Sequence, residues 1–139
     1  MKIHIFYEVT KYRFPGWRKA VVLIDKIIRS EGMIPGEINI IITTDEILTP
    51  INSEFLNHNY NTDVIAFENN SGNELNGEIY ISKDTVKRNA SNYKVSLECE
   101  ILRVMIHGIL HLTGYSDKTR REKAIMHKIE NMWLEKYFE

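Results

Sequence analysis

Residues 105–117 read MIHGILHLTGYSD, and this run closes the most apolar stretch of the chain. From Leu97 to Leu112, apolar residues fall on nearly every side of a helix, which is typical of a helix that is buried all round. Ser96 is a good N-cap, and Gly114 readily takes the left-handed conformation that ends a helix. The stretch therefore predicts the central helix of the core.

The same run carries three potential metal ligands. His107 and His111 are four residues apart, so on a helix their imidazoles share one face, with about 5–6 Å between Cβ atoms. After the stop at Gly114 the chain turns back, and Asp117 is the first ligand-type side chain to follow. Two imidazoles and one carboxylate hold a divalent ion and leave a position open for water, as in catalytic sites. The alternative is a pair of hydrogen-bonded core histidines, but the glycine and the acid that follow favour a metal site.

The spacing resembles the long zinc-protease motif, with one decisive difference. Those proteases place a glutamate general base directly after the first histidine. Here that position is Gly108, which has no side chain to accept a proton. Proteolysis by that route is therefore disfavoured, although a metalloprotease remains an alternative.

The stretch also resembles a known family. His-Gly-x-Leu-His-Leu-x-Gly-Tyr is the signature of the bacterial YbeY family of metal-dependent endoribonucleases and rRNA maturation factors. The family continues with Asp-His, whereas this chain has Ser116 and Asp117, so the third family ligand falls on Asp117. Residues 56–67 resemble the family's Leu-Asn-x-x-Tyr-Arg … Thr-Asp-Val-Leu-Ser-Phe block, and residues 77–82 resemble its Gly-Asp-Ile-x-Ile strand.

The resemblance implies a function and partners. The protein would cut single-stranded RNA as a metal-dependent endoribonuclease, in processing the 3′ end of 16S rRNA and in ribosome quality control. Its partners would be ribosomal RNA and the ribosome or its small subunit, and its cofactor one divalent metal ion per chain. Zinc is the first candidate, because Zn²⁺ lowers the pKa of bound water towards about 7. A carboxylate in place of a third histidine also makes harder ions acceptable, and the set resembles the two-histidine, one-carboxylate triad of Fe(II) oxygenases.

Two departures keep another function open. Asn61 stands where the family has the arginine associated with nuclease activity, and the chain carries a net charge of −1. Proteins that bind nucleic acid mainly through charge usually carry a basic excess. The alternative is a ribosome-assembly or RNA-binding factor that does not cleave and whose metal site is structural or vestigial. His58, among asparagines, is interpreted as a solvated loop residue.

No general base can be named from the sequence, and two acids are the candidates. Glu78 would lie on a strand, either as an exposed charge or as a cleft-lining acid near the metal, and Asp84 follows that strand. Basic residues that could contact phosphates stand on two predicted helices: Lys83, Lys87, Arg88 and Lys94, and Lys118, Arg120, Arg121 and Lys123.

The remaining pattern predicts one α+β domain over residues 1–139, a small mixed sheet of about four strands covered by helices. Strands are expected at residues 3–7, 37–43, 64–67 and 76–82, with Pro35-Gly36 as a turn. Helices are expected at residues 16–31, 50–57 (with Thr49 as N-cap), 83–94, 97–112 and 118–138. The first is expected to bury Trp17, Ala20, Val21, Ile24, Ile27 and Ile28, and the last to bury Ala124, Ile125, Ile129, Met132, Trp133 and Tyr137. No apolar run reaches the roughly 18 residues that span a bilayer. The single cysteine, Cys99, allows no intrachain disulfide, so a cytoplasmic protein without a membrane or disulfide partner is expected.

Overall fold

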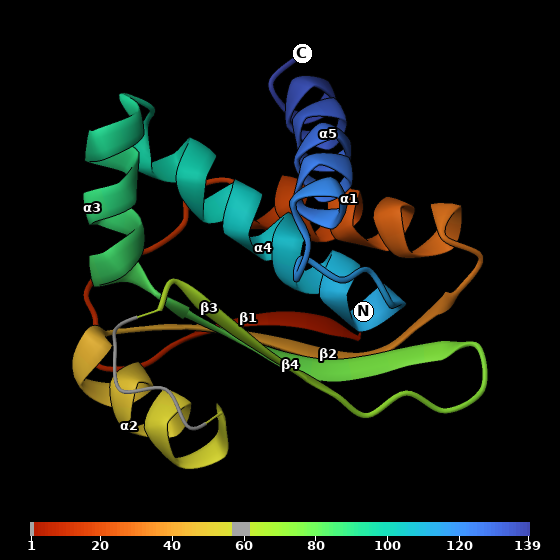
Figure 1. The fold of residues 1–139 in the computed structure, drawn as a ribbon, viewed down its shortest axis with the longest axis horizontal. Helices are drawn as coiled ribbons and strands as arrows, with labels where there is room; N and C mark the ends of the chain where they lie inside the picture. Colours follow the sequence, from red (N-terminus) through yellow and green to blue (C-terminus); the bar gives the residue numbers. More distant parts are fainter. Residues whose placement is uncertain (1, 57–61) are drawn as a thin grey trace.

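A mixed sheet with helices on both faces runs through the fold in the computed structural model, which describes residues 2–56 and 62–139 (Figure 1). Its strand order is β1-β2-β4-β3. Strand β2 runs parallel to both β1 and β4, and β3 is antiparallel to β4. The strands are β1 (Ile3–Tyr7), β2 (Ile34–Thr43), β3 (Val64–Glu68) and β4 (Glu74–Ser82).

Helices cover the two faces of the sheet unequally. The helices are α1 (Trp17–Ser30), α2 (Asp45–Leu56), α3 (Lys83–Tyr93), α4 (Leu97–Thr113) and α5 (Arg120–Tyr137). In Figure 1, α2 lies below the sheet, whereas α1, α3, α4 and α5 lie on its other side. Helix α4 rests on β3 and β4 and contacts α1, α3 and α5. The predicted α+β class, the mixed sheet and the central helix are therefore confirmed.

Burial of α4 follows from its composition. Ten of its residues are buried, including Ile101, Met105 and Ile109. The Ser96 side chain caps the first turn by accepting a hydrogen bond from the Cys99 N–H, and Gly114 ends the helix with φ 114°. Both predicted ends of the helix are confirmed.

Two glycines allow α4 to approach β4 closely. A Cβ built on Gly108 would lie 2.9 Å from Cγ2 of Ile79 on β4, and one built on Gly77 would lie 2.5 Å from the Phe67 carbonyl oxygen and 3.0 Å from Leu112 Cδ2. Contacts that short are not available to ordinary side chains, so glycine is required for this packing. The approach sets the depth at which His107 and His111 lie above the sheet.

Several predicted boundaries were wrong. The Pro35-Gly36 pair lies inside β2, where the register with β4 shifts between Pro35 and Ile38, instead of forming a turn. Helix α2 begins at Asp45, not after Thr49, and contains Pro50. The helix begins before the proline, where the Thr44 carbonyl accepts hydrogen bonds from the N–H groups of Ile47 and Leu48. Pro50 therefore lies inside the helix, and because it has no N–H, the helix lacks one backbone hydrogen bond at that position.

The buried faces of two helices differ from prediction. Trp17 was expected in the core, but it begins α1 and is 47% exposed. On α5, Ala124, Ile125 and Met132 are exposed, while Met126, Glu130 and Leu134 are buried beside Trp133 and Tyr137. Because α5 carries apolar residues on both its buried and its exposed sides, the sequence does not reveal which side is buried. A glutamate in the buried set also departs from the rule that glutamates are mostly exposed. None of the helices in the described ranges is long and apolar enough to cross a membrane.

Candidate metal centre

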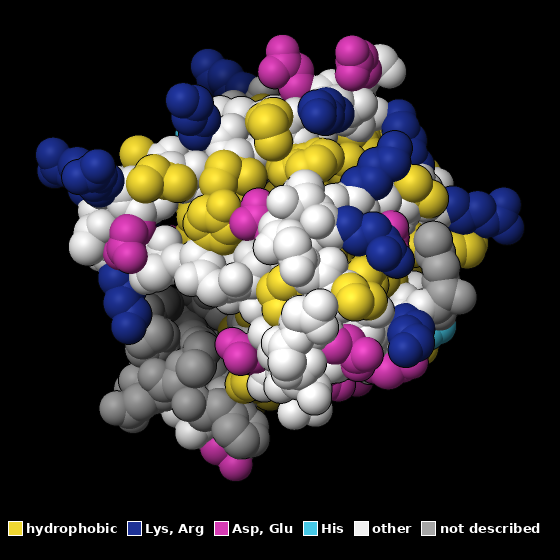
Figure 2. Space-filling view, turned by 90° about the vertical axis from the view of Figure 1, so that its right-hand side faces the viewer, with side chains coloured by type: hydrophobic (Ala, Val, Ile, Leu, Met, Phe, Trp, Pro, Cys, Tyr) yellow, Lys and Arg dark blue, Asp and Glu magenta, His cyan; other side chains and the backbone are white. Residues whose placement is uncertain are grey.

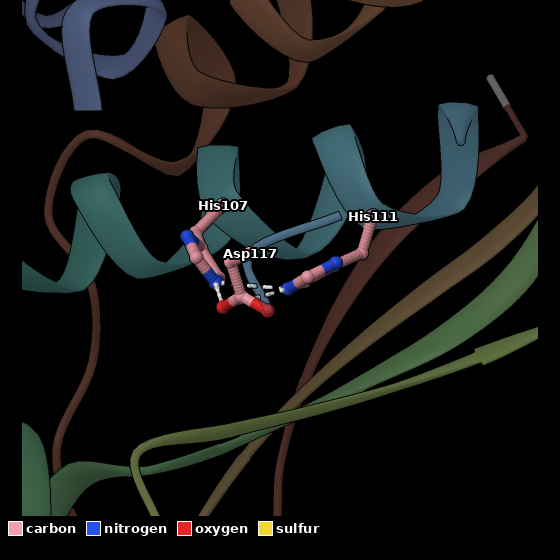
Figure 3. A group of neighbouring side chains, drawn as sticks. All are labelled: His107, His111 and Asp117. Atoms are coloured by element: carbon pink, nitrogen blue, oxygen red, sulfur yellow. Dashed lines mark hydrogen bonds and ion pairs between the residues drawn. The ribbon is translucent and has the colours of Figure 1, made fainter. Parts of the chain in front are cut away.

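The two histidines project from one face of α4, and Asp117 meets them from the segment after the helix (Figure 3). Gly114 turns the chain, and its N–H and that of Tyr115 bond to the carbonyls of His111 and Leu110. The segment that follows then runs back over the helix end and carries the carboxylate to the imidazoles. The side chains are 24% (His107), 29% (His111) and 38% (Asp117) exposed, which leaves the site open to solvent.

Three ligand atoms converge at short distances. His107 Nε2 lies 2.9 Å from His111 Nε2 and 3.2 Å from Asp117 Oδ2, and His111 Nε2 lies 3.4 Å from Asp117 Oδ2. Within the described part of the chain, these three residues are the His, Cys, Asp or Glu group placed to hold a metal ion. The sequence-predicted ligands are thus brought together.

The outer ring nitrogens determine what the inner ones can do. His107 Nδ1 lies 2.6 Å from Glu130 Oε2, and His111 Nδ1 lies 3.0 Å from the Tyr115 carbonyl oxygen. Both partners are acceptors, so each Nδ1 is the protonated nitrogen and donates. In the neutral rings, each Nε2 therefore presents a lone pair to the other and to the Asp117 carboxylate.

Three acceptors facing one another repel unless a positive charge lies between them. Tetrahedral ligation with bonds of about 2.0–2.1 Å places neighbouring ligand atoms about 3.3 Å apart. The observed separations of 2.9, 3.2 and 3.4 Å bracket that value. The donor set, its geometry and its hydrogen-bonded outer nitrogens fit a divalent cation with an open coordination position.

The charges around His107 favour a cation. Burial by itself lowers the pKa of His107, but the hydrogen bond to Glu130 and its negative charge, together with Asp117 and Asp63, raise it above the ordinary value. Burial raises the pKa of Asp63, although the charge of His107 opposes that shift. The negative field that stabilises a protonated imidazole stabilises a bound metal ion in the same way.

A second layer of residues supports the site. Glu130 is 4% exposed, and its Oε1 accepts a hydrogen bond from Arg103 Nη1 at 3.1 Å while its Oε2 accepts from His107. Arg103 Nη2 also donates to Asn131 Oδ1 at 2.7 Å. The chain Arg103–Glu130–His107 therefore ties α4 to α5 and orients one ligand ring.

Sequence reasoning missed this second layer. Arg103 lies four residues before His107 on the same helix face, and this spacing could have indicated that the two side chains share a partner. Glu130 was missed because the buried face of α5 was misassigned. Asp63 stands in the Thr-Asp-Val block that resembles the family, but the block alone assigned it no place beside His107.

The other predicted candidates lie away from the metal centre. Ile79 packs against Gly108. Since side chains alternate along a strand, Glu78 faces the opposite side of the sheet, and it is exposed. Asp84 Oδ2 accepts from the Asp45 N–H at the start of α2. Neither acid lines the site, so the cleft-lining interpretation of Glu78 is wrong and the exposed-charge one is confirmed. His58 and Asn61 lie outside the described residues.

The basic candidates are separated from one another. Arg88 donates to Asp45 Oδ2 at 2.7 Å, whereas Lys118, Arg120, Arg121 and Lys123 are exposed around the start of α5. On the face in Figure 2, Lys and Arg side chains are scattered among acidic and apolar ones and form no continuous patch.

Gly108 also excludes the protease arrangement on structural grounds, because a glutamate there would have to enter the space that Ile79 fills.

Known proteins resemble this chain over most of its length. The family model described as "Endoribonuclease YbeY" matches residues 8–138. A protein of Christiangramia forsetii with that name is 46% identical over 77% of this chain and 75% of its own length, and one of Chloroherpeton thalassium is 45% identical over 87% and 84%. The solution structure of TM1509 from Thermotoga maritima has a TM-score of 0.70 at 26% identity, covering 98% of this chain and 89% of that one. The chain therefore belongs to the YbeY endoribonuclease family.

Proposed function

We propose that the protein is a metal-dependent endoribonuclease that cuts single-stranded RNA during ribosomal RNA maturation. Relatives that carry the endoribonuclease name match most of the chain. The observation that carries the metal dependence is the convergence of two Nε2 atoms and one carboxylate oxygen, all within 4.8 Å of one another.

In this proposal His107, His111 and Asp117 hold one divalent ion, with zinc as the first candidate. When bound, such an ion acts as a Lewis acid towards a phosphoryl oxygen and acidifies water at neutral pH. Glu130 and the Tyr115 carbonyl hold the two rings in the tautomer that ligation needs. The site needs no glutamate at position 108, in contrast to the zinc proteases.

The proposed substrate determines partners and location. The resemblance to the family supports ribosomal RNA, at the 3′ end of 16S rRNA, and the ribosome or its small subunit as partners. A ribosomal RNA substrate would place the protein in the cytoplasm. The net charge of −1 means that affinity must come from local contacts near the metal, because the overall charge supplies little attraction for phosphates.

Metal analysis combined with an RNA cleavage assay tests the proposal. Purified protein is expected to hold one ion per chain and to cut a single-stranded RNA in a reaction that a chelator stops and added metal restores. His107→Ala and His111→Ala should lower metal content well below one ion per chain and abolish cleavage. His4→Ala, an exposed histidine on β1, is the matched control and should change neither.

Two outcomes would redirect the proposal. Full metal occupancy in the His107→Ala/His111→Ala double variant would exclude these residues as ligands. Metal binding and RNA binding without cleavage above that variant's background would favour the non-cleaving assembly factor, which Asn61 and the near-neutral charge already support.

A further inference from the structure

A pocket of about 330 Å³ opens beside the metal centre and shares His107 with it. Its wall also includes Glu100 and Arg103 from α4, Tyr93 from the end of α3, and His127 and Glu130 from α5. Asp117 and His111 do not line it. A group bound in this pocket would therefore lie next to the candidate metal centre, beside the part of α4 that is N-terminal to His107.

Glu100 is a buried carboxyl group that the rest of the fold does not use. The residue is 4% exposed, and among the described residues its side chain makes no hydrogen bond. Its nearest cation is Arg103, whose Nε lies 3.8 Å from Oε1. Burial raises the pKa of Glu100, and the Arg103 charge opposes that shift. The carboxylate lines the open pocket, where a bound group can supply hydrogen-bond donors.

The charges of the pocket exclude two classes of ligand. Arg103 is committed to Glu130 and Asn131, while Asp63, Glu100 and Glu130 add three acids to the lining. A phosphate would meet net negative charge there. A second metal ion is also disfavoured, because in the described ranges the ligand group of suitable spacing is His107, His111 and Asp117. What remains favoured is a neutral group that presents N–H donors.

The rim of the pocket offers a surface for a flat ring. Tyr93 is 64% exposed and Val95 is 40% exposed, and both line the pocket together with the buried Val104. Proteins that bind single-stranded nucleic acid commonly stack unpaired bases on such aromatic side chains. Glu100 and Tyr93 thus supply an edge partner and a face partner within one cavity.

We propose that this pocket, the base pocket, binds one unstacked base of the RNA substrate. Tyr93 packs against the face of the base, and the Glu100 carboxylate accepts hydrogen bonds from its edge. Guanine fits best, because its Watson–Crick edge presents two neighbouring N–H groups to a carboxylate, whereas uracil presents a single N–H between two carbonyls. The inference rests on the proposed RNA substrate and adds the base that the site selects.

The spacing along α4 agrees with this assignment. Glu100 and His107 are seven residues apart, which is about 10.5 Å along the helix axis. That separation is comparable with the reach from a phosphate to the far edge of a base in the same nucleotide. A nucleotide with its phosphate at the metal centre can therefore place its base in the base pocket.

Binding of four labelled RNA octamers tests the inference. Each is oligouridine with A, C, G or U at one central position, titrated into zinc-loaded protein by fluorescence anisotropy, with RNA integrity checked afterwards. The guanine octamer should bind about 10-fold more tightly than the uridine one. Glu100→Gln should reduce that preference below about 2-fold, because an amide replaces one acceptor by a donor. Tyr93→Ala should weaken the guanine octamer about 5- to 10-fold, and Tyr93→Phe should retain its affinity.

The matched control is Glu98→Gln, on the same helix but outside the pocket lining, and it should behave as the unmodified protein. An unchanged guanine preference in Glu100→Gln, or unchanged affinity in the folded Tyr93→Ala protein, would overturn the base pocket. Cleavage of the same octamers separates the two proposals. Guanine-selective binding without cleavage supports the base pocket and contradicts the proposed nuclease, whereas cleavage with no base preference contradicts the base pocket alone.

Discussion

At the residue scale, the site depends on which ring nitrogen of each histidine carries the proton. Hydrogen bonds to Glu130 and to the Tyr115 carbonyl place both protons on Nδ1 and leave both Nε2 atoms free for a cation. A conventional catalytic zinc site is completed in the same way, with outer partners that orient the ligands. Glu130 therefore belongs to the metal centre as much as the predicted ligands do.

Changing Glu130 tests that dependence. Glu130→Gln should lower metal affinity about 10-fold, because a neutral amide polarises the His107 ring less and loses its charge-assisted bond. The measurement is a competition titration with a chromogenic chelator. Glu135→Gln, an exposed acid on the same helix, should leave affinity unchanged. Equal affinities for both variants would show that the carboxylate has no part in metal binding.

Asp117 offers a second test at this scale, since the family pattern has a histidine in its place. Asp117→Ala should lose most bound metal, because two ligands remain. Asp117→His should retain it and favour Zn²⁺ over Mn²⁺ more strongly than the aspartate does, since imidazole suits zinc and carboxylate suits harder ions. Metal content after growth with both ions, read by elemental analysis, distinguishes these outcomes. An alanine variant at full occupancy would remove Asp117 from the ligand set.

At the element scale, the close approach of α4 to β4 depends on Gly108. Gly108→Ala places a methyl group 2.9 Å from Ile79 Cγ2, an overpacking that typically costs about 1–3 kcal/mol. The gain in helix propensity offsets about 1 kcal/mol of it. We expect a net loss of up to about 2 kcal/mol in the free energy of urea unfolding. In a double-mutant cycle with Ile79→Ala the penalty should disappear, and a penalty that persists would assign it to the helix itself.

The start of α2 is joined to β4 and α3 through one carboxylate. Asp45 accepts hydrogen bonds from Ser82, Thr85 and Arg88. Burial raises the pKa of Asp45, but these three bonds outweigh it and leave the pKa below the ordinary value. A carboxyl group whose folded pKa is lowered contributes stability above its unfolded pKa, and that stability is lost as the pH falls through the folded value.

Asp45→Asn should therefore cost about 1 kcal/mol of unfolding free energy at pH 7. The difference from the unmodified protein should shrink as the pH falls below about 4, because the carboxyl is protonated first in the unfolded state, and it should vanish once the folded carboxyl is protonated as well. Urea titrations at pH 7, 5 and 3 measure it. Glu37→Gln, an exposed acid on β2, serves as the comparison, and a pH-independent difference for Asp45→Asn would contradict the role of its charge.

At the scale of the whole molecule, the candidate metal centre joins segments that are distant in sequence. Its proposed ligands come from α4 and the connection after it, and their supports come from α5 and from the segment before β3. Binding to the folded state alone adds about 2.7 kcal/mol of stability at a free-metal concentration 100-fold above Kd. For a chain of this length that amounts to a rise in Tm of roughly 10 °C.

Thermal unfolding with and without metal measures this coupling. Chelation should lower the Tm of the unmodified protein by about that 10 °C, and the His107→Ala/His111→Ala variant should show no shift. A chelator-induced shift of the same size in the variant would place the stabilising ion elsewhere in the molecule.

The sequence by itself determined the central helix, its two ends, the mixed α+β character and the convergence of His107, His111 and Asp117. These features are local: a spacing of four residues and a glycine stop fix geometry within about 10 residues, through helix dimensions alone. Only the tertiary structure decided that Glu130 and Asp63 belong to the site, that Glu78 does not, and that Glu100 faces a pocket. Those placements depend on how α5 and the segment before β3 pack against α4. That packing is a sum of many small contacts between residues far apart in the chain, and no single periodicity records it.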